Sequence, residues 1–230
     1  SPDGKKLAYY VFDETDVKEF QMKMYGTLYP THYKFKYPKA GEDNSLISIR
    51  IFDTQYDRYF VFDVGNNPDI YIPRIMWSKR RDELIVFKMN RLQNKLELLS
   101  GTFSMDTPNN IGIKTKPIYT EKCTTYIDIH DNTSFINENE FIWTSEKDGY
   151  NHIYLINYAN GTEKQLTSGD WDVTEVYGYT SLSKKIFFQA AKSHPTKREI
   201  YALYTKNNKI ELLTEKSGTN EANFSKTFNY

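Results

Sequence analysis

Residues 140–173, EFIWTSEKDGYNHIYLINYANGTEKQLTSGDWDV, decide the fold of this chain. Aromatic and β-branched side chains dominate 141–143 and 152–156, as half-buried strands require. Residues 163–167 then return as a third strand. One antiparallel meander of about thirty residues cannot bury both of its faces, so we expect it to stack against copies of itself.

Glycines specify the two turns within this stretch. Gly149 ends a charged segment in which the chain reverses direction, and it tolerates the positive φ that a tight turn needs. Asn160 and Gly161 are the pair that a type I′ hairpin prefers, because both tolerate the left-handed conformation. The three strands are therefore predicted to run antiparallel.

The same pattern recurs along the chain. Equivalent strands begin at Leu84, Phe141 and Ile186, which lie 57 and 45 residues apart. Four-stranded units that recur roughly every 40–50 residues are typical of a β-propeller. No segment keeps a helical period over three turns. The sequence therefore predicts an all-β fold, a partial β-propeller of roughly four to five four-stranded antiparallel blades.

Strand-like segments cover most of the remaining chain, separated by short polar turns. Residues 107–112 are expected to form a loop, and residues 17–37 show an irregular pattern with two prolines. Outside 140–173 we expect strands at 6–12, 45–53, 58–64, 71–78, 83–89, 95–102, 116–120, 126–130, 174–179, 185–190, 199–204 and 210–214.

The first repeat is longer than the others. Leu7 and Leu84 are 77 residues apart, and a surplus of roughly 25 residues lies between Asp13 and Tyr37. We therefore expect an arm, at about 13–37, inserted into the hairpin of the first blade. Its apolar content favours an interface, because solvated loops seldom carry so many apolar groups. The apolar residues in question are Phe20, Met22, Met24, Tyr25, Leu28 and Tyr29.

The composition excludes several classes of protein. The 230 residues carry no net charge, so no bulk attraction to nucleic acid or to an anionic membrane is expected. No apolar run approaches the roughly 20 residues of a membrane-spanning helix. Cys123 is the single cysteine, which excludes an internal disulfide and disfavours a cysteine-built metal site. We therefore expect no metal, no cofactor and no nucleic-acid partner.

Six motifs lie in order along the chain: SPDGKKLAYY (1–10), YPKAG (37–41), YIPR (71–74), NRLQN (90–94), WTSEKDGY (143–150) and LTSGDWDV (166–173). Together they resemble the N-terminal propeller of the dipeptidyl peptidase IV family, with the bacterial branch as the nearest likeness. The resemblance covers essentially the whole chain. The ordered run of motifs is much more specific than any one of them.

The resemblance implies an eight-bladed propeller above a C-terminal α/β-hydrolase domain that releases N-terminal dipeptides, preferentially after proline or alanine. It also implies peptide substrates for the parent, a homodimer formed through the arm, and an extracytoplasmic location. The family's paired glutamates lie just before a Trp-Ser-Pro-Asp-Gly turn, and this chain starts inside that turn. We therefore expect residues 1–230 to be one propeller fragment, truncated at both ends.

No catalytic residue is expected within the chain. The nucleophilic serine of such hydrolases sits in a G-x-S-x-G elbow, and no such motif occurs between Ser1 and Tyr230. The fragment alone would lack the nucleophile, the triad and the paired glutamates. Whether the parent releases dipeptides or tripeptides is left open by the sequence.

His130 and Arg91 are candidates for lining the substrate pocket that the resemblance implies. Strand alternation would place Asp128 on the same face as His130, as a metal site would need. No third ligand is predictable, so a polar strand end is the better interpretation. Arg91 is more readily a structural arginine than a substrate clamp. Trp143 and Trp171 occupy repeat positions, which favours packing within the propeller over stacking on a sugar.

These observations predict the non-catalytic propeller segment of a serine exopeptidase. It would restrict access to the active site, help to shape the substrate pocket and dimerise through the arm, while a Ser-His-Asp triad outside the chain performs acyl transfer. The alternative is a stand-alone interaction propeller without hydrolase activity, which the repeat alone permits. A G-x-S-x-G hydrolase in the same reading frame would decide between the two.

Overall fold

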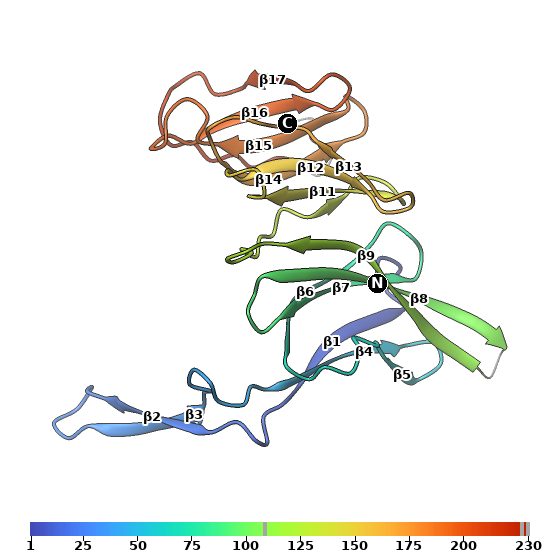
Figure 1. Ribbon diagram of the computed structural model, residues 1–230, viewed down its shortest axis with the longest axis vertical. Helices are drawn as coiled ribbons and strands as arrows, with labels where there is room; N and C mark the ends of the chain where they lie inside the picture. Colours follow the sequence, from blue (N-terminus) through green and yellow to red (C-terminus); the bar gives the residue numbers. More distant parts are fainter. Residues whose placement is uncertain (108–109, 226–227, 229–230) are drawn as a thin grey trace. The chain divides into compact units, whose positions relative to one another are not determined.

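The computed structural model describes residues 1–107, 110–225 and 228, and all regular structure in them is strand (Figure 1). No helix in this part of the chain is long and apolar enough to cross a membrane. The strands are β1 (Lys6–Asp13), β2 (Glu19–Met24), β3 (Thr31–Lys36), β4 (Leu46–Asp53), β5 (Arg58–Val61), β6 (Ile70–Trp77), β7 (Glu83–Asn90), β8 (Lys95–Thr107), β9 (Asn110–Lys122), β10 (Ser134–Phe135), β11 (Glu140–Ser145), β12 (His152–Asn157), β13 (Thr162–Gln165), β14 (Val173–Thr180), β15 (Lys185–Ala190), β16 (Glu199–Tyr204) and β17 (Lys209–Leu212).

The strands form antiparallel sheets of the kind that make propeller blades, and the chain divides into two compact units. Unit 1 comprises Ser1–Trp77 and Asp82–Ile127, and unit 2 comprises Ser78–Arg81 and Asp128–Tyr230. Three sheets are four-stranded with consecutive strand order: β6-β7-β8-β9, β10-β11-β12-β13 and β14-β15-β16-β17. The all-β fold and the partial propeller are confirmed by this architecture.

Unit 1 pairs a three-stranded sheet, β1-β4-β5, with the sheet β6-β7-β8-β9. Alternate residues of β4, Ile49 and Ile51, are fully buried, as the two-residue period of a strand requires. They pack in one cluster with Phe62 of the segment after β5 and with Leu84 and Val86 of β7. Side chains from both sheets therefore share one apolar core.

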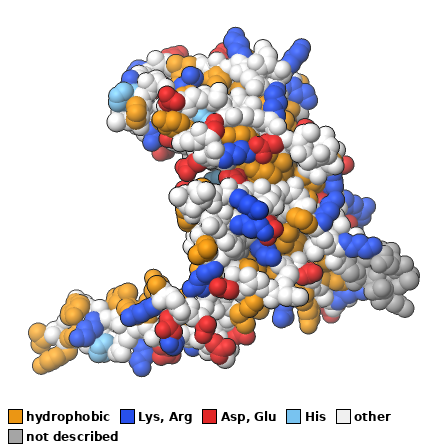
Figure 2. All heavy atoms as spheres, viewed as in Figure 1, with side chains coloured by type: hydrophobic (Ala, Val, Ile, Leu, Met, Phe, Trp, Pro, Cys, Tyr) orange, Lys and Arg blue, Asp and Glu red, His pale blue; other side chains and the backbone are white. Residues whose placement is uncertain are grey.

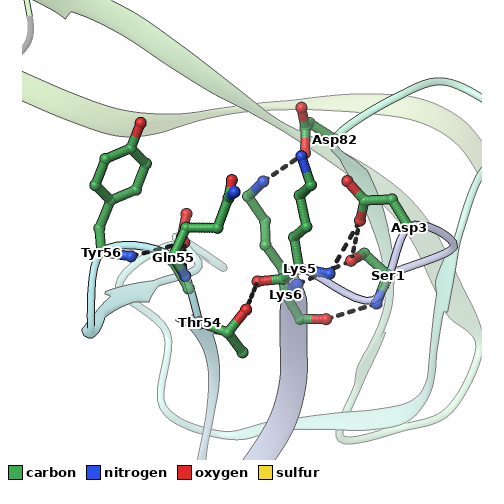
Figure 3. Close-up of polar contacts among 9 residues, drawn as sticks. Ser1, Asp3, Lys5, Lys6, Thr54, Gln55, Tyr56 and Asp82 are labelled. Atoms are coloured by element: carbon green, nitrogen blue, oxygen red, sulfur yellow. Dashed lines mark hydrogen bonds and ion pairs between the residues drawn. The ribbon is translucent and has the colours of Figure 1, made fainter.

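The SPDG turn leads into β1 through side-chain hydrogen bonds (Figure 3). The Ser1 hydroxyl donates to Asp3 at 2.6 Å and accepts the Lys6 backbone N–H at 2.9 Å. The Lys6 ammonium then reaches Asp82, in the turn before β7, at 2.5 Å. It also lies 4.9 Å from the centre of the Phe103 ring. The motif thus fixes the start of β1 and ties it to the second sheet of unit 1.

Unit 2 contains the stretch quoted first, now seen as β11, β12 and β13, with β10 completing the sheet. The sheet β14-β15-β16-β17 repeats the same order. Ile142, Ile153, Ile186 and Phe188 are buried in one cluster that joins the two sheets. The predicted repeat of the 140–173 meander is therefore present in the structure.

The turn after β12 differs from the prediction. β12 and β13 pair as the predicted hairpin. Gly161 has a φ of 73°, but the φ of Asn160 is not positive, so the predicted type I′ turn is wrong. Four residues separate β12 from β13, and the Asn157 side chain accepts the backbone N–H groups of Ala159 and Asn160. This cap stabilises a longer turn that needs only one left-handed residue.

Two other segment predictions are wrong. A loop was expected at 107–112, but Thr107 belongs to β8 and residues 110–112 belong to β9. The two strands pair as far as Thr107 and Asn110. Residues 108–109 lie outside the described residues. The strand expected at 126–130 is irregular chain. The boundary between the two units falls within that segment. The Ile127 N–H donates to the backbone carbonyl of Gln93, in a turn, and not to a neighbouring strand.

A buried carboxylate in unit 2 predicts acid sensitivity. Glu199 is 4% exposed, and hydrogen bonds from the hydroxyls of Ser193 and Tyr201 lower its pKa. A depressed pKa in the folded state stabilises the fold above the ordinary carboxyl range of about 4.3, and this contribution is lost as the pH falls below it.

We expect Glu199→Gln to lower the free energy of unfolding at pH 7 and to flatten its decline between pH 5 and pH 3. Urea unfolding at several pH values measures both effects. Glu215→Gln, at an exposed position of the same unit, is the control. An unchanged pH dependence in the Glu199 variant would contradict the role given to its hydrogen bonds.

Candidate functional site

A two-stranded hairpin in unit 1 belongs to no blade sheet. Strands β2 and β3 pair only with each other, whereas β1, which precedes them, pairs directly with β4, which follows them. Figure 1 shows the hairpin projecting from the sheet β1-β4-β5. The pattern of residues 17–37, interpreted as irregular from the sequence, contains two regular strands.

The two faces of the hairpin differ completely in chemistry. Directly opposed residues of an antiparallel pair share a face, and the face alternates along each strand. One face carries the pairs Phe20–Phe35, Met22–Tyr33 and Met24–Thr31. The other carries Glu19–Lys36, Gln21–Lys34 and Lys23–His32. The hairpin is therefore an amphipathic ribbon.

Aromatic rings make the apolar face continuous. The Phe35 ring lies 5.8 Å from that of Phe20, 5.4 Å from that of Tyr33 and 5.9 Å from that of Tyr37. At the tip, Leu28 is 91% exposed. Figure 2 shows apolar side chains along one side of the hairpin and at its tip. Such a concentration of exposed apolar groups is typical of an interaction surface.

The structure places the six arm residues predicted from the sequence on this apolar surface. Phe20, Met22 and Met24 lie on the strand face, and the other three form the tip. Sequence reasoning missed Tyr33, Phe35 and Tyr37, which complete the face. Alternation of apolar residues at Phe20-x-Met22-x-Met24 and Tyr33-x-Phe35-x-Tyr37 was the signal that could have found them.

An acidic pocket of about 710 Å³ lies at the foot of the hairpin. Carboxylates dominate its lining, with one arginine among them: Asp13, Asp16, Glu42, Asp43, Asp69 and Arg91. Hydrogen bonds from the Thr15 hydroxyl and then its backbone N–H lower the pKa of Asp13, so this carboxyl stays ionised. Such a lining favours positively charged groups over anions.

Arg91 is held in this pocket by the turn between β7 and β8. The Asn90 side chain accepts the backbone N–H groups of Asn94 and Lys95, which fixes the NRLQN turn. Arg91 then donates to Asp69 and to the Glu42 carbonyl, both at 3.2 Å. The guanidinium therefore ties two loops together at the pocket wall.

His130 lies in unit 2, in the chain segment before β10. Its ring packs edge-on against Trp143, with 4.4 Å between ring centres, and its Nδ1 accepts the Asn132 backbone N–H at 3.3 Å. The Asn132 side chain donates to Thr144 and accepts the Val176 backbone N–H, so it links β11 to β14. Asp128 and His130 are not on a strand, so the alternation invoked for them does not apply.

The described residues contain no group of three or more His, Cys, Asp or Glu arranged to hold a metal ion. Cys123 is exposed, and hydrogen bonds from the Thr125 hydroxyl and backbone N–H lower its pKa. Trp143 and Trp171 are 2% and 8% exposed, so both pack inside unit 2 and neither offers a face to a sugar.

Comparison with known proteins identifies relatives of the whole chain. The family model for the dipeptidyl peptidase IV (DPP IV) N-terminal region matches residues 1–230. Dipeptidyl peptidase 4 from Arthroderma otae is 26% identical over 218 residues, which covers 88% of this chain and 27% of that protein. The corresponding protein from Trichophyton equinum is 26% identical over 232 residues, or 94% of this chain and 29% of its own length.

A solved structure extends the comparison to three dimensions. The crystal structure of Porphyromonas gingivalis dipeptidyl peptidase 4 is 35% identical, with a TM-score of 0.87, and the match covers 99% of this chain and 32% of that one. The chain therefore spans less than a third of the length of each of these three relatives.

Proposed function

Because this chain belongs to the dipeptidyl peptidase IV family, as part of its N-terminal region, we propose that it serves an exopeptidase that releases N-terminal dipeptides. The match over all 230 residues is the observation that carries the proposal. The chemistry belongs to a C-terminal α/β-hydrolase domain of the same polypeptide, in which a Ser-His-Asp triad performs acyl transfer. The propeller restricts access of peptides to that site.

Two residues of this chain contribute to the pocket in the proposal. Arg91 lies in unit 1, where hydrogen bonds to Asp69 and to the Glu42 carbonyl hold its guanidinium in place. His130 is oriented by its contact with Trp143. Both act by shaping the pocket and neither takes part in bond breaking.

The hairpin makes the enzyme a homodimer in the same proposal. The exposure of its apolar face and tip in this chain supports the proposal that they form an interface. The location is extracytoplasmic, which is inferred from the family alone.

Cleavage of a Gly-Pro chromogenic amide tests the peptidase function. We expect the full-length protein to release the chromophore and these 230 residues alone to show only background hydrolysis, because no nucleophile elbow lies within them. A full-length protein without activity and without a G-x-S-x-G motif would overturn the proposal in favour of an interaction propeller. Activity in the 230 residues alone would show that the catalytic residues lie within this chain and not in a C-terminal domain, which would contradict the proposal.

A further inference from the structure

We propose that Asn160, in the turn between β12 and β13, is a site of spontaneous modification. The Gly161 backbone nitrogen attacks the Asn160 carboxamide, and the asparagine is converted through a cyclic succinimide into isoaspartate and aspartate. Water is the only co-reactant. The inference goes beyond the proposed function, because peptidase activity plays no part in the reaction.

The sequence of the turn favours this ring closure. A glycine after asparagine gives the least steric hindrance, because it carries no Cβ beside the attacking nitrogen. Asn160 and Gly161 form the one asparagine–glycine pair in the 230 residues. Both residues are exposed, so water and hydroxide can reach them. A Cβ built on Gly161 would meet no atom within 4 Å, so the space beside this glycine is open.

The attacking nitrogen is not committed to another contact. Among the residues that the structure describes, the Gly161 N–H donates no hydrogen bond to a backbone carbonyl. The reaction requires this nitrogen to lose its proton. A hydrogen bond from the N–H to a carbonyl would have to break first, and no such cost arises at Gly161.

The Asn160 carboxamide is prepared for attack by Thr162. Its Oδ1 accepts the Thr162 backbone N–H at 3.0 Å and the Thr162 hydroxyl at 2.8 Å. Attack on Cγ moves negative charge onto this oxygen, and two donors aimed at it stabilise that charge as an oxyanion hole does. The same bonds fold the side chain back over the Gly161 peptide, so little conformational freedom is lost when the ring closes.

The reaction balances with water alone. The Gly161 nitrogen gives its proton to hydroxide and forms a bond to Cγ of Asn160. The bond from Cγ to Nδ2 then breaks, and the amide nitrogen leaves as ammonia after taking a proton from water. Hydrolysis of the ring at Cγ gives aspartate. Hydrolysis at the main-chain carbonyl gives isoaspartate, in which the chain continues through the side chain. Nothing is oxidised or reduced.

The corresponding turn of the next sheet, between β16 and β17, provides a control within the same chain. Asn207 is exposed there, and its Oδ1 accepts the Lys209 backbone N–H at 3.1 Å. Asn208 takes the place of the glycine, however, and its N–H donates to the Tyr204 carbonyl at 2.9 Å. Asn207 therefore has a similar bond to its side-chain oxygen but a hindered and engaged nitrogen, and it should react more slowly.

Incubation of the full-length protein in mildly alkaline buffer tests the proposal. Peptide mapping by mass spectrometry and an isoaspartate methyltransferase assay measure the products. We expect isoaspartate at position 160 to form about tenfold or more faster than at position 207. Thr162→Val should slow the reaction about threefold or more, whereas Thr162→Ser, which keeps the hydroxyl, should not. Asn160→Gln, which cannot form the five-membered ring, gives the background.

A synthetic peptide of residues 158–164 gives the rate without the fold. A rate in the folded protein equal to or above that of the peptide supports the proposal. An unmodified Asn160, or a folded rate about tenfold or more below that of the peptide, would overturn it, because the turn would then protect the carboxamide. Aspartate without isoaspartate would indicate direct hydrolysis and overturn the ring closure. A faster reaction in Thr162→Val would overturn the role given to the two donors.

Discussion

Replacing Trp171 with alanine should reduce the free energy of unfolding of unit 2 by about 3–5 kcal/mol. The side chain is 8% exposed and belongs to the cluster that joins the two sheets of the unit. Phe188 stacks on it at 6.4 Å between ring centres, and His152 meets it edge-on at 5.0 Å. Alanine would leave a cavity lined by rings that strands hold in place.

The backbone before Trp171 is shaped to receive the indole. Gly169 has a φ of 124°, and a Cβ at that position would lie 2.6 Å from the indole nitrogen. The Gly169 carbonyl also accepts a hydrogen bond from His152 Nε2 at 2.9 Å, while His152 Nδ1 bonds the Thr167 hydroxyl at 3.1 Å. Loss of the indole would therefore loosen a polar contact as well as an apolar one.

Urea unfolding followed by the fluorescence of the two remaining tryptophans, of which Trp143 is buried in the same unit, measures the effect. Trp171→Phe is the matched control and should cost less than half as much, because it retains a ring between Phe188 and His152. A loss below about 1 kcal/mol for Trp171→Ala would contradict the packing role.

Trp171 illustrates what the sequence can predict. It sits in a motif whose strand pattern repeats in the next sheet, so its position in the repeat predicts burial. The strands of unit 2 were predictable for the same reason. Each combines β-branched or aromatic residues with flanking turn residues, and local pattern and tertiary packing agree there.

The hairpin shows where the sequence was misread. Its alternation is regular within β2 and β3, but each strand has only six residues and the two prolines lie on either side of β3, so the pattern of 17–37 as a whole is irregular. The prediction for residues 126–130 was wrong in the opposite way, because a strand was expected there and the chain is irregular. Its apolar and polar residues alternate like those of a strand, yet it connects the two units, and the Ile127 N–H bonds the Gln93 carbonyl in a turn.

The acidic pocket lay beyond sequence reasoning altogether. Its lining comes from the end of β1, the return of the hairpin, the segment before β6 and the turn after β7. These segments are separated by up to about 80 residues. The pairing of β1 with β4 brings Asp13 beside Leu46, and the pairing of β6 with β7 brings Asp69 near Arg91. Arg91 could be named as a candidate, but its partners Asp69 and Glu42 could not.

Gly101→Val should destabilise unit 1 by about 3 kcal/mol. Gly101 lies in β8, and a Cβ there would meet the Phe62 ring at 2.1 Å. Phe62 is 1% exposed and packs with Ile49, Ile51 and Leu84, so its ring has no free space to enter. The backbone of Gly101 is held between β7 and β9, which prevents it from moving away.

A double-mutant cycle separates this overlap from any general effect on β8. Gly101→Ala should cost clearly less in a Phe62→Leu background than in the wild-type protein, because the smaller side chain vacates the space that the new methyl group needs. Gly26→Ala, at the tip of the hairpin where a Cβ meets no atom within 4 Å, should be nearly neutral. Urea unfolding of the four proteins in the cycle gives the coupling energy. Additive costs would show that Phe62 is not the residue that requires glycine at position 101, whereas coupling of about 1 kcal/mol or more would identify the ring contact as the reason.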